Sequence, residues 1–341
     1  MFKFGKKVRE SVGLDIGSHS VKVVSIIKDA DKRILSAYNI KKIQQEDGKA
    51  VKIGKVIKET LEEVDIKPSQ VNLSISGANV IVRFITMPVM SKEHLENAMV
   101  FEAEKYIPFN VNEVIMDFHI LGSPEKGQMN VLLAAAKKDY VQSQIELMEK
   151  LGIGINVIDV NAFAVFNAYA AFNPISDEKG TAFVDFGYTQ TNVLVTTGVI
   201  PRFMRLIQIG GKDIYAALAE DARISADEAE KKIFELFGKE GGNDVVSYPA
   251  LTSVMDELSK EIQLSYGYFE NKQAKPVGNT YYSGGMAYQP GVVSYCEKKL
   301  GIQMTSWNPM KSFVLAESLS KEAVDTIGSQ FAVPVGLALR D

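Results

Sequence analysis

The amino-acid sequence predicts an α/β protein of two similar lobes, with an α+β subdomain inserted into the first lobe. The chain has 341 residues, which is more than one compact domain usually holds. A pattern of apolar strand, Asp-x-Gly, polar turn and second strand occurs twice, over residues 15–23 and 185–193. Between the two copies, residues 78–152 follow a strand-helix-strand-strand-helix order of their own.

Composition is that of a soluble globular protein. The formal charge of -4 and the sequence pI of about 5.6 disfavour a nucleic-acid partner. A single cysteine, Cys296, excludes internal disulfides and thiolate metal clusters and fits a reducing compartment. Residues 1–9 lack the apolar segment of a signal peptide, and are either a solvated terminus or a weak contact with an anionic membrane. Polar residues within 153–175 argue against a membrane span there, so we expect a cytoplasmic protein.

The first half opens with a meander of strands. Residues 11–16, 21–27 and 34–43 are rich in β-branched residues or partly alternate, which predicts three strands. Apolar spacing of three and four residues predicts a helix over 51–64, and alternation predicts a further strand over 71–76.

The inserted block begins with a strand over 80–87 that Pro88 ends. Ser91 is a suitable N-cap for a helix to about residue 106, and Pro108 follows it. Residues 114–121 and 129–136 predict paired strands around a turn, and Gly152 ends a helix over 139–151.

The second half repeats the order of the first. Gly210 and Gly211 precede one helix, and Ser225 with Glu228 forms a capping box for the next. Predicted strands cover 181–186, 191–197, 201–209 and 279–282, and predicted helices run to about 222, over 225–238 and over 250–271. The predicted domains are 1–77 (first-lobe core), 78–152 (inserted subdomain), 153–179 (return to the first lobe with a connecting helix), 180–330 (second lobe, helical over about 211–275) and 331–341 (C-terminal connecting helix).

The repeated turn suits a phosphate group. Glycine lets the backbone approach a ligand closely, and turn amides with Ser or Thr hydroxyls form an anion-binding concavity. A strand-end aspartate is placed to hold magnesium through water. One Asp-x-Gly alone is usually an ordinary turn, but two matched copies predict hairpins that clamp a polyphosphate, where Lys22 either adds a positive charge or points to solvent. The predicted residues are Asp15 and Asp185 for magnesium, and Gly17, Ser18, His19, Ser20, Lys22, Gly187, Tyr188, Thr189, Gln190, Thr191, Gly210, Gly211, Gly284 and Gly285 for the nucleotide.

Other chemistries lack their motifs in this sequence. Neither a Gly-x-x-x-x-Gly-Lys-Ser/Thr loop nor a Gly-x-Ser-x-Gly elbow occurs. The three histidines, His19, His94 and His119, are far apart and have no carboxylate at metal-ligand spacing. Aromatic and basic residues do not interleave, so a nucleic-acid platform is not predicted.

These motifs resemble those of the superfamily of actin, sugar kinases and heat-shock chaperones, whose duplicated, two-lobed fold is ribonuclease H-like. Within it, the sequence resembles the PilM family of actin-like cytoplasmic proteins in type IV pilus assembly. The inserted block is the most specific evidence, through residues 83–88, 102–109 and Asp117. With residues 12–22, 283–286 and 336–340, the resemblance covers nearly the whole chain. The block is less similar to that of the division protein FtsA.

One helix departs from the family pattern. Family members usually carry Ala-Glu-x-x-Lys on the helix that reaches the ribose, whereas here Ala229-Glu230 is followed by Ile233. Glu228 and Lys232 are candidate substitutes, which leaves the ribose contact open. The resemblance also adds Met286 to the nucleotide residues.

The resemblance implies a protein that binds ATP with Mg²⁺ and captures the N-terminal cytoplasmic tail of a PilN-like membrane protein, in a nucleotide-sensitive way, in a groove beside the inserted subdomain. Such partners would place it at the inner face of the cytoplasmic membrane. Other pilus platform proteins and the assembly motor are further expected partners. The candidate partner-binding residues are Arg83, Phe84, Ile107, Pro108 and Phe109.

The resemblance also bears on catalysis. Asp159 lies where relatives place a water-orienting acid or amide, although a hydrogen-bonded strand-end aspartate is the alternative. Any ATPase activity is expected to be slow. The alternative functions are a sugar-type kinase and an FtsA-like filament-forming protein. A kinase requires a base at a substrate hydroxyl and a second pocket, and the sequence has no recognisable loop for them.

Overall fold

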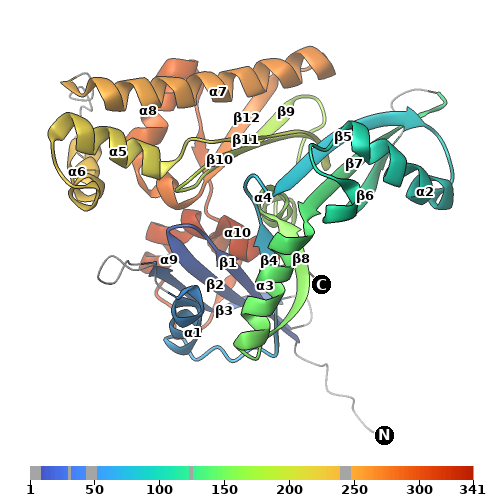
Figure 1. Ribbon diagram of the computed structural model, residues 1–341. Helices are drawn as coiled ribbons and strands as arrows, with labels where there is room; N and C mark the ends of the chain where they lie inside the picture. The colour runs from blue at the N-terminus through green and yellow to red at the C-terminus, as the bar shows by residue number, and fades with distance from the viewer. Residues whose placement is uncertain (1–8, 30–31, 44–51, 123–125, 239–246, 341) are drawn as a thin grey trace, which may run out of the picture.

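The computed structural model describes residues 9–29, 32–43, 52–122, 126–238 and 247–340 (Figure 1). They form two lobes, each built on one sheet, and a smaller three-stranded subdomain beside them. The sheet orders are β14-β3-β2-β1-β4-β8 in the first lobe and β11-β10-β9-β12-β13 in the second. Each sheet contains an antiparallel meander followed by two parallel strands, and this shared order confirms the duplicated fold that the sequence predicts.

Helices cover both faces of the first-lobe sheet. β1 and β2 form an antiparallel hairpin in which Asp15 lies opposite Lys22. Helices α1 and α3 pack Ile57 and Met148 against Leu14 of this sheet. The elements are β1 Arg9–Ile16, β2 Ser20–Asp29, β3 Lys32–Lys42, α1 Ile53–Glu62, β4 Gln70–Ile75, α3 Lys138–Lys150, β8 Gly154–Val160 and β14 Val314–Leu315.

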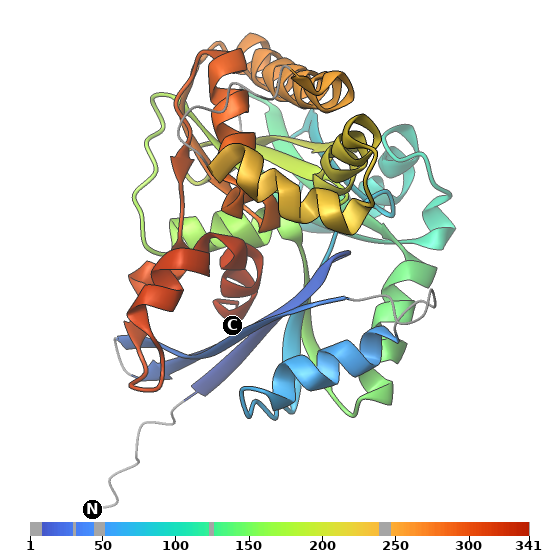
Figure 2. The same cartoon turned by 90° about the vertical axis from the view of Figure 1, so that its left-hand side faces the viewer.

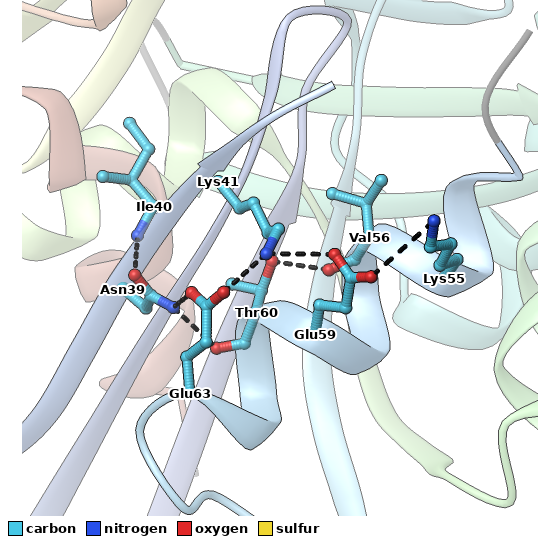
Figure 3. Close-up of polar contacts among 8 residues, drawn as sticks. All are labelled: Asn39, Ile40, Lys41, Lys55, Val56, Glu59, Thr60 and Glu63. Atoms are coloured by element: carbon cyan, nitrogen blue, oxygen red, sulfur yellow. Dashed lines mark hydrogen bonds and ion pairs between the residues drawn. The ribbon is translucent and has the colours of Figure 1, made fainter. Parts of the chain in front are cut away.

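A polar network fixes α1 against β3 (Figure 3). The Lys41 ammonium lies 3.0 Å from a carboxylate oxygen of Glu59 and 2.5 Å from one of Glu63. The Asn39 amide donates to the Thr60 carbonyl over 3.0 Å and to the Glu63 carboxylate over 2.9 Å. Because exposed ion pairs of this kind stabilise a protein by at most about 1 kcal/mol each, the apolar face of α1 contributes more to this contact.

Two adjacent strands of the second-lobe sheet, β9 and β10, are buried on both faces. Every residue of β9 and β10 is buried, because side chains that point to either face meet helices. Val184 and Val193 belong to the core under the second-lobe helices, whereas Phe183 and Leu194 belong to the core shared with the first lobe. The elements are β9 Gly180–Phe186, β10 Thr191–Thr197, β11 Ile200–Ile207, α5 Gly211–Ala222, α6 Ala226–Gly238, α7 Pro249–Gln273, β12 Val277–Ser283, α8 Pro290–Leu300 and β13 Thr305–Ser306.

The inserted subdomain is an antiparallel sheet of order β5-β7-β6 with one helix on it. Helix α2 packs Leu95 and Met99 against Ile85 and Leu133. The outer strands, β5 and β6, each pair only with β7 among the strands of the described residues. Helix α2 ends at Glu102, earlier than predicted, and continues as a short 3-10 helix. The elements are β5 Val80–Pro88, α2 Lys92–Glu102, the 3-10 helices Ala103–Lys105 and Val111–Glu113, β6 Val114–Gly122 and β7 Gln128–Lys137.

The packing of two elements differs from the predicted domains. We predicted the helix over 139–151 as the last element of the inserted block, but α3 packs Met148 into the first-lobe core. Near the other end, β14 pairs with β3, so the chain leaves the second-lobe sheet before residue 330. Periodicity reports that a helix has a buried face, but not which sheet that face covers.

Two helices join the lobes. α4 (Asn161–Ala170) and α10 (Ala332–Ala338) lie side by side between the two sheets (Figure 2). They cross closely at Gly336, where an added Cβ would overlap the Ala164 carbonyl. None of the helices in the described ranges combines the length and apolar character that crossing a bilayer requires. The remaining elements are α9 Lys321–Ile327 and the 3-10 helices Gly285–Tyr288, Pro309–Ser312 and Gly328–Phe331.

Candidate functional site

A cavity of about 670 Å³, the interlobe cavity, lies between the two lobes. The β1–β2 and β9–β10 hairpins enter it from opposite lobes, and the loop after β12 and helix α6 form its other walls. Most of the predicted site residues therefore meet in one place. Those that line the cavity are Asp15, Gly17, Ser18, His19, Ser20, Lys22, Asp185, Gly187, Tyr188, Thr189, Gln190, Gly284, Gly285 and Met286.

The two hairpins have the same local structure. The Gly17 amide donates to the Ser20 carbonyl over 3.1 Å, and the Gly187 amide donates to the Gln190 carbonyl over 3.0 Å. An added Cβ at Gly187 would approach the Gln190 carbonyl oxygen to 2.6 Å, so the turn requires glycine there. Each lobe therefore presents a matching turn, with its polar side chains and backbone groups, to the cavity.

The loop after β12 passes close to the second aspartate. Gly284 has φ 103°, a conformation that favours glycine. A Cβ at this position would overlap the Phe186 carbonyl and approach the Asp185 Oδ1 to 2.6 Å. The glycine thus lets a third backbone segment reach the cavity.

Two carboxylates and one ammonium group meet at the base of the cavity. Asp15 and Asp185 are buried, and the Lys22 Nζ lies 3.1 Å from the Asp15 Oδ2. Burial, and then the charge of Asp15, raise the pKa of Asp185. Buried acceptors nearby, Asn192 Oδ1 and Gln289 Oε1, have no hydrogen-bond partner within the described ranges, and both residues line the cavity. This donor set fits a divalent cation and its water ligands.

Sequence reasoning missed Glu230, which closes the outer side of the cavity. Its carboxylate lies 3.3 Å from the His19 Nε2 and 2.5 Å from the Lys42 Nζ, so it joins the two lobes. Burial lowers the pKa of His19 in this contact. Phe234, one helical turn further along α6, also lines the cavity. Other lining residues that we did not predict include Lys42, Asn161, Tyr215, Tyr288 and Gln330.

The two predicted ribose residues on α6 point elsewhere. Glu228 caps the helix, since its carboxylate accepts from the Ser225 amide over 2.8 Å and from the hydroxyl over 2.7 Å. The Lys232 ammonium lies 5.7 Å from the Tyr248 ring centre. Positions two residues before or after Glu230 fall on other faces of a helix. The helical spacing of residues along α6 is the sequence signal that could have separated Glu230 from these two positions.

Three further predicted residues support the hairpin without lining the cavity. The Thr191 hydroxyl is buried and donates to the Ile209 carbonyl over 2.9 Å. An added Cβ at Gly210 would approach the Tyr188 carbonyl oxygen to 2.5 Å. The Gly211 amide donates to the Gly187 carbonyl over 3.1 Å. These three residues therefore hold the β9–β10 turn in place through contacts outside the cavity.

A second cavity of about 710 Å³, the junction groove, lies where the inserted subdomain meets both lobes. β6 and β7 form one wall, β8 and α4 form another, and the turn between β10 and β11 forms a third. Consecutive residues of β6, from Asp117 to Leu121, line it. Because neighbouring strand residues point to opposite faces, the groove follows the free edge of β6.

Asp159 lies in the junction groove and not in the interlobe cavity. Its carboxylate pairs with the Arg340 Nε at 3.2 Å and accepts from the Val160 amide over 2.7 Å. Burial raises the pKa of Asp159. The predicted catalytic role has no geometric support, because this carboxylate does not face the repeated hairpins.

None of the predicted partner-binding residues, all of which the structure describes, lines the junction groove. The Arg83 Nε donates to the Tyr106 carbonyl over 3.0 Å. Ile107 is buried in the subdomain core, and Phe109 packs against that core beneath the Lys137 ammonium. Phe84 is half-buried and Pro108 is exposed. The predicted partner-binding residues on β5 and in the turn after α2 therefore lie apart from the junction groove, which β6 lines.

The family model for type IV pilus assembly protein PilM matches residues 13–341. The chain belongs to the PilM family. A solved PilM-PilN type IV pilus biogenesis complex contains a chain 27% identical to this one, with a TM-score of 0.83; the alignment covers 97% of this chain and 98% of that chain. The ethanolamine utilization protein EutJ from Carboxydothermus hydrogenoformans shares the fold, at 14% identity, a TM-score of 0.54 and coverage of 97% and 89%. The predicted actin-like fold and pilus assembly family of this PilM family member are thus confirmed.

Proposed function

We propose that this PilM family member binds ATP with Mg²⁺ in the interlobe cavity and holds the N-terminal cytoplasmic tail of a PilN-like membrane protein in the junction groove. The observation that carries the proposal is the pair of cavities with different chemistry. Repeated glycine turns and buried carboxylates line one, whereas exposed apolar residues and a free strand edge line the other. The first suits a charged ligand and the second an extended peptide.

In the interlobe cavity, Asp15 and Asp185 are the residues that would hold Mg²⁺ through water. The metal would neutralise phosphate charge and orient the phosphates. The Gly17 and Gly187 turns would contact the phosphates, and Lys22 would add positive charge. Two buried carboxylates beside one lysine leave negative charge for a cation to offset.

In the junction groove, the apolar side chains would receive the tail. Ile115, Ile120 and Val199 line the groove and are 48%, 40% and 70% exposed. Large apolar residues exposed together on one concave surface are typical of binding sites. The edges of β6 and β8 offer backbone groups to an extended chain. The solved complex of a related chain with PilN supports a PilN-like partner as the occupant.

This arrangement implies a membrane-associated assembly component. Binding to the cytoplasmic tail would hold the protein at the inner face of the cytoplasmic membrane. Contacts with other platform proteins and with the assembly motor belong to the same proposal. Family membership favours this role over a sugar-type kinase.

The test is the affinity of the full chain for a synthetic peptide with the cytoplasmic tail of a PilN-like protein from the same organism, measured by fluorescence anisotropy. We expect Ile120→Ser to weaken binding by about five- to tenfold, because partial burial of an isoleucine contributes about 1 kcal/mol or more. Val314→Ser is the matched control, since Val314 is a 54% exposed strand residue outside the groove. Equal affinity of the two variants, both shown to be folded, would refute the groove.

A further inference from the structure

The turn between β10 and β11 belongs to the second lobe but forms part of the junction groove. Val199, Ile200 and Pro201 line this groove, opposite residues of the inserted subdomain and of β8. Val199 is 70% exposed, so its apolar side chain is available to a ligand. β11 also contacts β5 of the inserted subdomain, and Figure 1 shows this end of the second-lobe sheet beside β5.

The opposite ends of the same strands lie at the interlobe cavity. β10 begins directly after Thr189 and Gln190, and Asn192 lines the cavity beside Asp185. β10 is paired along its length with both β9 and β11, with one irregularity on the β11 side after Val195. Its seven residues span roughly 20 Å at the usual rise of a strand. The fully buried strand β10, which is hydrogen-bonded to a strand on each side, therefore runs from one cavity towards the other.

The contacts between the lobes at the interlobe cavity are ones that a ligand would alter. The Ser18 and Thr189 hydroxyl oxygens lie 3.2 Å apart, and the His19 and Tyr188 ring centres lie 4.3 Å apart. The cavity residue Glu230 adds ion pairs across the gap. A ligand that enters between the hairpins would have to replace some of these contacts between the lobes.

We propose that the β10–β11 turn couples the two sites: the position of the second lobe, set by nucleotide, determines how closely Val199 contacts the tail in the junction groove. This inference rests on the proposed function. The first-lobe wall does not depend on the position of the second lobe in the same way, because β8 is paired within the first-lobe sheet. Nucleotide then changes tail affinity through its preference for one lobe position, and the tail changes nucleotide affinity by the same factor.

The experiment measures the affinity of the full chain for the tail peptide with and without ATP and Mg²⁺. In the unmodified protein we expect the two dissociation constants to differ by about fivefold or more, the usual range for coupled sites. Val199→Ser should bring their ratio to within about twofold of unity, while its affinity for ATP without peptide is unchanged. Val314→Ser should retain the original ratio.

Ile120→Ser distinguishes a loss of coupling from a loss of peptide binding. It should weaken peptide binding by a similar factor with and without nucleotide, and so preserve the ratio of the two dissociation constants. The coupling is overturned if Val199→Ser retains the full ratio of dissociation constants, or if that ratio is one in the unmodified protein. Neither outcome contradicts peptide binding in the junction groove. Failure of the unmodified protein to bind the peptide at all overturns the groove and the coupling together.

Discussion

The side-chain oxygens of Ser18 and Thr189 lie 3.2 Å apart, although the residues are separated by 171 positions. Each belongs to the polar turn after one of the two Asp-x-Gly sequences. The duplication therefore appears as a direct contact between matching turns of the two lobes. We expect a polyphosphate bound between the hairpins to separate this pair.

A disulfide between the turns should exclude nucleotide. In Ser18→Cys/Thr189→Cys, the sulfurs replace oxygens already in contact, so we expect mild oxidation to cross-link the lobes. Cys296 is buried and should not compete. ATP affinity should fall by about tenfold or more on oxidation and return on reduction, because the cross-link removes the space for phosphate. Calorimetry of both forms, with Ser18→Cys alone as control, checks this. Unchanged ATP affinity after complete cross-linking would contradict the assigned site.

Magnesium-dependent binding should weaken as pH falls. Burial and the Asp15 charge raise the pKa of Asp185, so the folded chain holds this proton more tightly than the unfolded chain does. Ionised Asp185 thus costs folding free energy at neutral pH, and this cost disappears as pH falls through the raised pKa. Because Mg²⁺ competes with the same proton, its contribution to ATP affinity should fall over that range.

Asp185→Asn should abolish this pH dependence. It should also raise the melting temperature of the protein without Mg²⁺ at neutral pH, because the asparagine carries no buried charge. Calorimetric ATP titrations at several pH values, with the exposed Asp177→Asn as control, measure the effect. An Asp185→Asn protein with the original Mg²⁺ dependence would show that the metal is held elsewhere.

The crossing of α4 and α10 should tolerate no side chain at Gly336. An added Cβ would overlap the Ala164 carbonyl, so Gly336→Ala should destabilise the fold by about 1–3 kcal/mol, as overpacking does. Gly267→Ala is the control, because Gly267 lies within α7 and no atom beyond the adjacent backbone of that helix lies within 4 Å of its added Cβ. That variant should be more stable by about 0.5–1 kcal/mol. Urea denaturation compares them, and equal stability would contradict the packing at this crossing.

Arg83 should contribute to the stability of the inserted subdomain and not to the affinity for the tail. Its Nε donates to the Tyr106 carbonyl and it does not line the junction groove in the described structure. Arg83→Ala should therefore lower stability by about 1 kcal/mol and leave tail affinity within about twofold. A loss of tail affinity like that of Ile120→Ser would return β5 to the partner-binding surface.

Local patterns explain which predictions succeeded. The Asp-x-Gly turns, their flanking strands and the separate order of the inserted block depend on neighbouring residues, and each was visible in the sequence. Glu230 was missed because its role depends on the rotation of α6, which brings it to His19 and Lys42. Asp159 ends a strand, and a strand end can face either of two cavities; the structure places it in the junction groove.

The sequence by itself determined the duplication and the two matched Asp-x-Gly turns, because repeats and hydrophobic periods act over short distances. Its resemblance to a known family indicated the actin-like architecture. Only the tertiary structure decided that β6 and the β10–β11 turn share one groove. These segments are about eighty residues apart and belong to different sheets. Their meeting depends on how helices α4 and α10 set the lobes against each other, and no local pattern of apolar residues encodes the angle between two packed sheets.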